Sequence, residues 1–410
     1  MAKRKDNKGI VLKDGESYRE KENRYSFRWT SKDGKRYSVY AKTLKELREK
    51  EAKIQHDLYD GIRVEDKNVT INDVYQTWKK DKKGLKSSTK GNYYYMYEQY
   101  VMNDFGERKV QDIKKSDVRR FYNELHENKK ISFNTLDTIH NVLHQVFDLA
   151  VEDDYIRINP TDRTLKDCKQ AHNYERPKRH ALTIPEQTAF VEFMRNTPQY
   201  KHWLPLFTVF LGTGCRVSEI IGLRWEDVNM KEGYIDINHG ISYYQREFKE
   251  CYFVVSDSTK TKAGTRIIPM LKEVKQALLD EKAFQEECGT KCEVSYNGYT
   301  DFIFLNRFGN VHNPQTINRA IKRITLAYNM QEIEKAEKES REPLLLPSFS
   351  CHNLRHTFAT RYCENETNLK VIQEILGHKD IATTMDVYAE ATKEAKVKSF
   401  SDLEGKIKIS

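Results

Sequence analysis

Five side chains in the second half of the chain could together hold and attack a phosphate group. They are Arg216, the pair His352 and Arg355, His378, which follows a leucine and a glycine, and Tyr388 ten residues later. A tyrosine phenol is a nucleophile that can bond covalently to phosphorus. A guanidinium group can bind a phosphate through two parallel N–H···O hydrogen bonds, and an imidazole can donate a hydrogen bond or transfer a proton. The set therefore predicts a centre for phosphoryl transfer.

Arg216 stands at the expected start of a helix, in Gly212-Thr-Gly-Cys-Arg216-Val-Ser-Glu219. The glycines let the backbone approach a phosphate closely. Arg216 and Glu219, three residues apart, project from one face of this helix, where the carboxylate can fix the guanidinium. Taken alone, this spacing indicates only an ion pair at the protein surface. A functional role for Arg216 and Glu219 depends on the sequence around them.

His352 and Arg355 share one face of a second expected helix, while Leu354 and Phe358 share another face that can anchor the helix in a core. A phosphate on the first side meets an imidazole and a guanidinium at once. His356 adds a His-x-x-x-His spacing, but no glutamate occupies the place that a zinc protease requires. We therefore expect neither a metal nor a cofactor.

These motifs together resemble the active site of the tyrosine recombinases, also called the phage integrase family. The resemblance is carried by Gly-Cys-Arg216-Val-Ser-Glu-Ile-Ile-Gly-Leu-Arg-Trp-Glu-Asp-Val, the His-x-x-Arg pair, Leu-Gly-His378 and the tyrosine that follows. It implies that Tyr388 attacks phosphorus, which gives a 3′-phosphotyrosyl bond and a free 5′-hydroxyl without ATP. It also implies that Arg216 and Arg355 clamp the phosphate, that His352 assists proton transfer or donates to a non-bridging oxygen, and that His378 donates to the phosphate.

In this family a lysine on a β-hairpin protonates the departing 5′ oxygen. The segment Ser258-Thr-Lys260-Thr-Lys262-Ala-Gly264-Thr-Arg266 looks like two short strands around a turn. Lys260, in its Thr-Lys-Thr context, is the predicted general acid. The turn also lets Lys262 compete for that role, and we otherwise predict Lys262 as a DNA contact.

Residues 1–62 predict a β-hairpin followed by a helix. Residues 25–30 and 36–40 alternate in the manner of half-buried strands around Asp33-Gly34, and a capping box opens at Thr43. Residues 1–50 hold 16 Lys and Arg against 8 Asp and Glu, nearly all of the net charge of +9. Such a basic ribbon could lie in a DNA groove, and a protein-binding or structural module is the alternative. The predicted arm-site DNA contacts are Arg24, Arg28, Lys35 and Arg36.

The remaining chain is mainly helical. Residues 68–165 predict four helices at the position of the family's core-binding domain, and 166–180 a basic, aperiodic linker. Residues 181–410 predict the catalytic domain, a mixed α/β but mostly α fold with strands near 234–238, 251–255, 266–269 and 302–304. The predicted fold class is thus mainly α with small β-sheets. The tail after Tyr388 packs either on a neighbouring protomer or on its own domain.

Composition narrows the class further. A chain of 410 residues predicts two or three domains, and no apolar stretch is long enough for a membrane span. The N-terminus lacks the apolar run of a secretory signal, and seven cysteines indicate free thiols in a reducing compartment. We therefore expect a cytoplasmic bacterial protein that acts on the nucleoid.

The predicted function is a site-specific recombinase that integrates and excises a mobile element, most similar to integrases of conjugative transposons. The expected partners are double-stranded DNA at core and arm-type sites, three further copies of the chain in a tetramer, and an excisionase. The alternatives are a phage integrase, a chromosome-dimer-resolving recombinase, a type IB topoisomerase, a metal-dependent nuclease, and a non-catalytic DNA-binding protein of the same fold. The DNA sites and the direction of reaction do not follow from the sequence.

Overall fold

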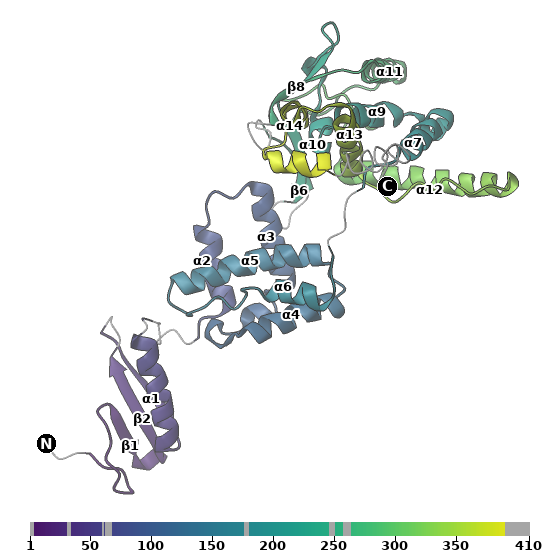
Figure 1. Cartoon of the computed structure of the whole chain (residues 1–410). Coiled ribbons are helices and arrows are strands. Elements are labelled where there is room, and N and C mark those ends of the chain that lie inside the picture. The colour runs from purple at the N-terminus through teal and green to yellow at the C-terminus, as the bar shows by residue number, and fades with distance from the viewer. Residues whose placement is uncertain are drawn as a thin grey trace, which may run out of the picture. The chain divides into compact units, whose positions relative to one another are not determined.

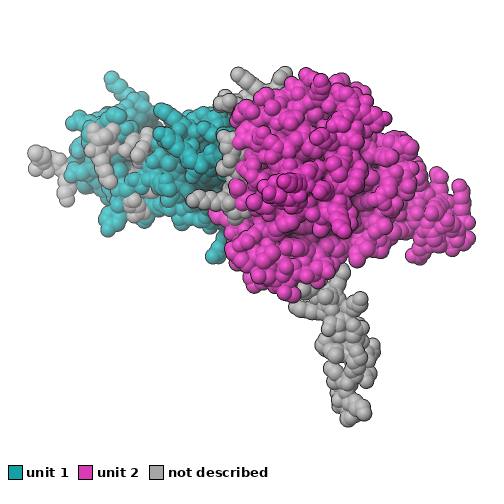
Figure 2. Space-filling model, turned by 90° about the horizontal axis from the view of Figure 1, so that it is seen from above, with its two compact units in different colours: residues 1–176, 246–249 teal, residues 177–245, 250–410 magenta. Residues whose placement is uncertain are grey.

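The structure is a computed structural model that describes residues 4–30, 34–59, 61, 68–175, 180–245, 251–256 and 264–389. The chain divides into two compact units (Figure 2). Unit 1 contains residues 1–176 and 246–249, and unit 2 contains residues 177–245 and 250–410. No helix among the described residues combines the length and the apolar character needed to cross a bilayer.

The N-terminal module of unit 1 is an antiparallel sheet with one helix on one of its faces (Figure 1). Its elements are β1 (Glu16–Arg19), β2 (Arg24–Thr30), β3 (Arg36–Ala41) and α1 (Leu44–Tyr59). Tyr25 and Phe27 of β2 pack with Leu47 and Ile54 of α1. The predicted hairpin is present as β2 and β3, whereas β1 was not predicted. Its four residues carry no apolar alternation, and its place is fixed by buried Glu16, which accepts from Arg48 of α1 at 2.9 Å.

The second part of unit 1 is a helical bundle with an aromatic core. Its helices are α2 (Ile71–Asp81), α3 (Ser87–Tyr100), α4 (Lys115–Glu127), α5 (Phe133–Glu152) and α6 (Thr164–Ala171). Tyr75 of α2 stacks on Tyr97 of α3 with the ring centroids 3.6 Å apart. Leu165 and Cys168 of α6 belong to the same core. The segment predicted as an aperiodic linker from residue 166 therefore begins inside a packed helix, because the apolar pair was too short to register as a periodic pattern.

Unit 2 is built around one apolar helix. Its helices are α7 (Ile184–Asn196), α8 (Pro198–Lys201), α9 (Leu204–Thr213), α10 (Val217–Gly222), α11 (Lys272–Cys288), α12 (Pro314–Lys338), α13 (Cys351–Asn365) and α14 (Leu369–Leu376). Helix α9 packs against α7, α11 and α13, and its residues Phe207, Val209 and Phe210 are fully buried. A helix that is apolar all round requires such a central position. Helix α13, which carries His352 and Arg355, is thereby set against the core.

Two small antiparallel sheets complete unit 2. They are β4 (Val228–Asn229), β5 (Tyr234–Ile237) and β8 (Arg266–Pro269) in the order β4-β5-β8, and the hairpin β6 (Gly240–Gln245) and β7 (Cys251–Ser256). The strands predicted near 234–238, 251–255 and 266–269 are confirmed. The strand predicted at 302–304 is wrong, since Phe302 makes a single bridge to Arg224 and its neighbours pack into the core instead.

Candidate active site

The C-terminus of α14 is the point at which the predicted site residues meet. Gly377 ends the helix in the left-handed conformation, with φ of +63°, and its N–H and that of His378 bond back to carbonyls one turn earlier. This termination satisfies some of the helix's last carbonyl groups and leaves those of residues 375–377 exposed to other partners. Those partners are three arginine side chains from three other segments of unit 2.

Each of the three successive carbonyls accepts a hydrogen bond from a different arginine. The bonds are Arg266 Nε to Ile375 O at 2.7 Å, Arg355 Nη2 to Leu376 O at 2.5 Å, and Arg216 Nη2 to Gly377 O at 2.7 Å. Cations at a helix C-terminus are favoured by the partial negative charge of its carbonyls. The arrangement brings Arg216 and Arg355 together and adds Arg266, which the sequence did not single out as a site residue.

Glu219 ties two of these arginines together. Its carboxylate is 4% exposed and accepts from Arg216 Nη1 at 2.7 Å and from Arg266 Nη2 at 2.9 Å. It also accepts from the backbone N–H of Arg216 at 2.8 Å, which closes a capping box at the start of α10. Burial would raise the pKa of Glu219, but hydrogen bonds and charge from Arg266 and then Arg216 hold that pKa below its usual value. Glu219 is therefore a buried anion within a cationic cluster.

Of the two arginines predicted to bind the phosphate, Arg355 is the more deeply buried. Its side chain lies on α13, is buried, and donates a second bond from Nη1 to Gly214 O at 2.7 Å. Burial, and then the charge of Arg216, lower the pKa of Arg355 to about 10. The cluster holds three guanidinium groups and one carboxylate, which bonds to two of them, so it keeps a net positive charge at a largely buried place. Such a site suits an anionic phosphate whose charge grows during reaction.

His378 follows the helix end directly and is neutral at physiological pH. Burial, and then the charges of Arg355, Arg216 and Arg266, lower its pKa to about 4. Its Nδ1 lies 3.0 Å from the hydroxyl of Thr384, which is fully buried. With that hydroxyl as donor, the imidazole carries its proton on Nε2 and can donate it to an oxygen. No pattern in the sequence singled out Thr384.

His352 and Tyr388 are the two other predicted site residues that the structure describes. His352 is exposed on the first turn of α13, near enough for its charge to affect the pKa of His378. Residues 381–389 are helical, and half-buried Tyr388 packs on a small apolar cluster that includes Leu376. The nucleophile predicted from sequence thus packs on the same apolar cluster as Leu376, the last residue of α14. Lys260 and Lys262 lie outside the described residues.

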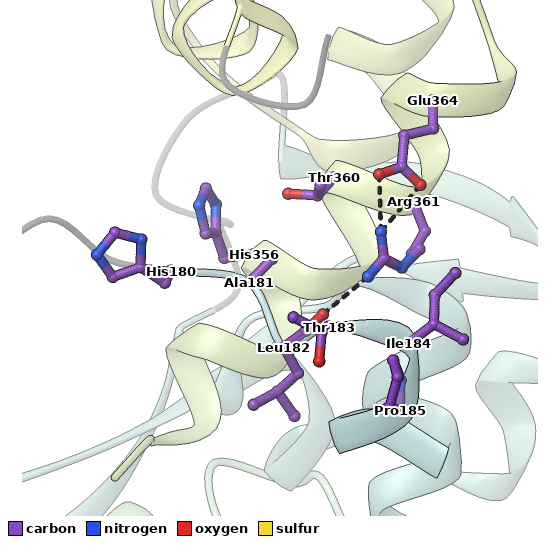
Figure 3. A pocket seen from close by; sticks show the side chains of 10 residues that line it. All are labelled: His180, Ala181, Leu182, Thr183, Ile184, Pro185, His356, Thr360, Arg361 and Glu364. Carbon is purple, nitrogen blue, oxygen red and sulfur yellow. Dashed lines mark hydrogen bonds and ion pairs between the residues drawn. The ribbon is translucent and has the colours of Figure 1, made fainter. Parts of the chain in front are cut away.

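A cavity beside α13 shows how this helix is attached at the start of unit 2 (Figure 3). It is lined by residues 180–185 together with His356, Thr360, Arg361 and Glu364. Arg361 donates to Leu182 O at 2.9 Å and to Glu364 at 2.7 Å, and Leu182 N–H donates to Thr357 at 2.9 Å. None of the arginine-cluster residues lines this cavity. The cavity therefore lies apart from the arginine cluster, and the bonds of Arg361 and Thr357 attach α13 to Leu182.

Three of the four predicted DNA contacts of the N-terminal module lie on the sheet face that α1 leaves uncovered, and Lys35 directly precedes β3. Arg24 and Arg28 of β2 and Arg36 of β3 alternate with the core residues, and Arg28 and Arg36 are exposed. Arg24 pairs with Glu22 and lies 4.2 Å from the ring centroid of Tyr40. Lys35 is exposed at the start of β3. Within the described part of the chain, no group of three or more His, Cys, Asp or Glu could hold a metal ion.

Gly214 supplies the carbonyl that holds Arg355, and it tolerates no side chain. Its φ is +60°, and a Cβ there would lie 2.3 Å from the ring of Phe358. We expect Gly214→Ala to lower the free energy of unfolding by about 3 kcal/mol, from backbone strain and overpacking together. Gly233→Ala is the matched control, because Gly233 also has a positive φ, +78°, but open space around it. Equal losses for both variants in urea unfolding would contradict the close packing.

Comparison with known proteins identifies the family. The model of the phage integrase family matches residues 181–395, that of the DNA binding domain of Tn916 integrase matches 1–58, and that of the phage integrase N-terminal SAM-like domain matches 70–126. The Tn1545 transposase of Streptococcus pneumoniae and the Tn916 transposase of Enterococcus faecalis are each 30% identical, over 95% of this chain and 94% of theirs.

A solved structure agrees with these matches. The Tn1549 transposon integrase, in complex with transposon right end DNA, is 26% identical with a TM-score of 0.67, over 82% of this chain and all of that one. A λ integrase dimer bound to a core site shares the fold, with a TM-score of 0.54 at 17% identity. The chain therefore belongs to the phage integrase family, the tyrosine recombinases, and is of the conjugative-transposon type.

Proposed function

We propose that this protein integrates and excises a mobile element by cutting and rejoining DNA with Tyr388 as the nucleophile. The observation that carries the proposal is the meeting of Arg216, Arg355 and His378 at the end of α14, whose last residue, Leu376, belongs to the apolar cluster on which Tyr388 packs. These are the residues that the sequence motifs predict to bind and attack a phosphate. Relatives named as transposases and integrases of conjugative elements support the choice of substrate.

The hydrogen bonds of the two arginines support the binding of a phosphodiester between them. Arg216 and Arg355 each use two of their five N–H donors on protein oxygens, which fixes their planes and leaves donors for a phosphate. The Tyr388 oxygen bonds to phosphorus as the bond to the 5′ oxygen breaks. The proton of the tyrosine passes to His352, and the departing oxygen takes a proton from Lys260. The 3′-phosphotyrosyl bond keeps the energy of the diester, so the reverse attack requires no ATP.

The assembly that we propose is a tetramer on two duplexes, with one tyrosine for each of the four strands. Each subunit binds a core site with its two larger domains and an arm-type site with the N-terminal sheet, in the bacterial cytoplasm on the nucleoid. An excisionase that shifts the reaction toward excision is part of this proposal. The Tn1549 integrase complex with DNA and the λ integrase tetramer on a Holliday junction are the related assemblies.

The covalent step gives the direct test of this function. We expect the protein to form a covalent complex with a nicked duplex that carries an element end, in EDTA, because a nick lets the 5′ fragment leave and traps the intermediate. Tyr388→Phe should form none. Tyr362→Phe, in the same apolar cluster, should retain it. A denaturing gel measures the complex, and a Tyr388→Phe protein that still forms it would contradict the assignment.

Thr384 should matter through the tautomer of His378. In Thr384→Val the Nδ1 proton is no longer disfavoured, so the Nε2 donor is lost in part. We expect covalent-complex formation to slow about five-fold, because the loss of one hydrogen bond raises the activation free energy by about 1 kcal/mol. Thr325→Val is the matched control, since the buried Thr325 hydroxyl has no hydrogen-bond partner. Single-turnover rates at saturating DNA measure the effect, and equal rates for the two variants would refute the role of Thr384.

The N-terminal sheet should bind DNA through its uncovered face. We expect Arg28→Ala and Arg36→Ala each to weaken arm-site binding, and to reduce the slope of log K against log salt by about 0.9 for each lost phosphate contact. Lys45→Ala removes the same charge from the exposed side of α1 and should leave the slope unchanged. Fluorescence anisotropy over a salt series measures these slopes. A slope lowered by Lys45→Ala but not by Arg28→Ala would place the DNA on the opposite face.

A further inference from the structure

Arg266 is a buried cation with no part in the chemistry described so far. It begins strand β8, and its side chain is 5% exposed. Its guanidinium donates to Glu219 through Nη1 at 3.2 Å and Nη2 at 2.9 Å, and to Ile375 O through Nε at 2.7 Å. Nη1 also reaches Gly264 O at 3.0 Å, and Nη2 lies 3.7 Å from Cys215 Sγ. A group that is buried and engaged on all sides cannot itself contact a DNA phosphate.

Its contacts nevertheless lead to two proposed catalytic side chains. Arg266 fixes the Glu219 carboxylate, which accepts a hydrogen bond from Arg216 Nη1 at 2.7 Å. Through Ile375 O, it fixes the end of α14, from which His378 projects. A planar guanidinium with a fork of donors can bridge two acceptors at fixed angles, which a lysine ammonium cannot do. The position therefore requires arginine specifically.

Strand β8, which carries Arg266, is held in place by its pairing with β5. The β8 backbone pairs with β5, where Arg266 lies opposite Ile237 in the register. The segment with Lys260 and Lys262 immediately precedes this strand in the sequence. Arg266 is thus fixed by the sheet on one side and by the cluster on the other.

We propose that Arg266 is a positioning residue for DNA cleavage, acting on Arg216 through Glu219 and on His378 through the end of α14. The proposal rests on the proposed function. It makes Arg266 a determinant of the rate at which bound DNA is cut and leaves DNA affinity nearly unchanged, because the residue touches no DNA.

The rival account is that Arg266 only stabilises the fold, as a buried ion pair does. Unit 2 provides a matched control for this account in Arg224, whose side chain is 13% exposed. Arg224 donates to buried Asp227 from Nη2 at 3.1 Å and from Nε at 3.3 Å, and lies 4.4 Å from the ring centroid of Tyr299. None of these partners belongs to the arginine cluster. A purely structural arginine–carboxylate pair is therefore available in the same unit.

The test compares Arg266→Lys, Arg266→Gln and Arg224→Lys in the full-length protein. For each we would measure melting temperature, affinity for a core-site duplex, and the single-turnover rate of covalent-complex formation on the nicked duplex at saturating DNA. We expect both Arg266 variants to bind DNA within about three-fold of wild type and to cut it at least about ten-fold more slowly. Arg224→Lys should cut at the wild-type rate once folded protein is saturated with DNA.

A pH profile separates positioning from stability. Arg216, Arg266, Arg355 and Cys215 are the charged or titratable groups around Glu219. With Arg266 replaced by glutamine, Glu219 keeps the hydrogen bonds from Arg216 and the charge of Arg355 but loses its strongest partner, so burial raises the pKa of its carboxyl above that in wild type. Protonated Glu219 no longer holds Arg216, so the cleavage rate of Arg266→Gln should begin to fall at a higher pH than that of wild type as the pH is lowered. Wild type and Arg224→Lys should not show this added loss.

The outcomes are distinct. If wild type forms no covalent complex, the proposed function fails, and the positioning role of Arg266 fails with it. If wild type cuts DNA and Arg266→Lys cuts it at the same rate, the positioning role is refuted while the function stands. If Arg266→Lys and Arg224→Lys lose rate equally, in proportion to their loss of melting temperature, Arg266 is structural only, which also refutes the proposal.

Discussion

The arrangement of the candidate site depends on one contact, the burial of the C-terminus of α14 among three guanidinium groups. A helix end has carbonyls without intrahelical partners and a partial negative charge, and burying it without donors is costly. Arg216, Arg266 and Arg355 supply the donors. The arginines repel one another in turn, and Glu219 with the carbonyls offsets that repulsion. Helix end and cations therefore stabilise each other, and the cluster keeps the excess positive charge that a phosphate requires.

The groups in this contact come from segments far apart in the chain. Arg216 begins α10, Arg266 begins β8, Arg355 lies on α13, and His378 follows α14. The apolar helix α9 sets α13 in place, and the glycine turn after α9 brings Gly214 O to Arg355. The site can form only when unit 2 is folded. Its electrostatics follow from the same packing, because burial and neighbouring cations keep His378 neutral.

The sequence predicted the motif residues because their spacing within each helix and their order along the chain carry the information. It also predicted the strand pairing of β2 with β3, where a turn signal separates two alternating runs. It did not reveal Arg266 or Thr384 as parts of the site. Arg266 stands in a basic segment where any cation could be solvent-exposed, and only the tertiary contact with Glu219 distinguishes it. Thr384 is one of several threonines near Tyr388, and only its distance to His378 distinguishes it.

The central proposal is that Arg216 and Arg355 bind the phosphate with the N–H groups that remain after each has bonded to a carbonyl at the end of α14. A crystal structure of Tyr388→Phe on an uncut core-site duplex tests it directly. We predict that Arg216 still donates to Gly377 O and Arg355 to Leu376 O, while their remaining N–H groups bind the phosphate at the cleavage position. Arginines that have left both carbonyls to reach the phosphate, with the end of α14 displaced, would contradict the claim.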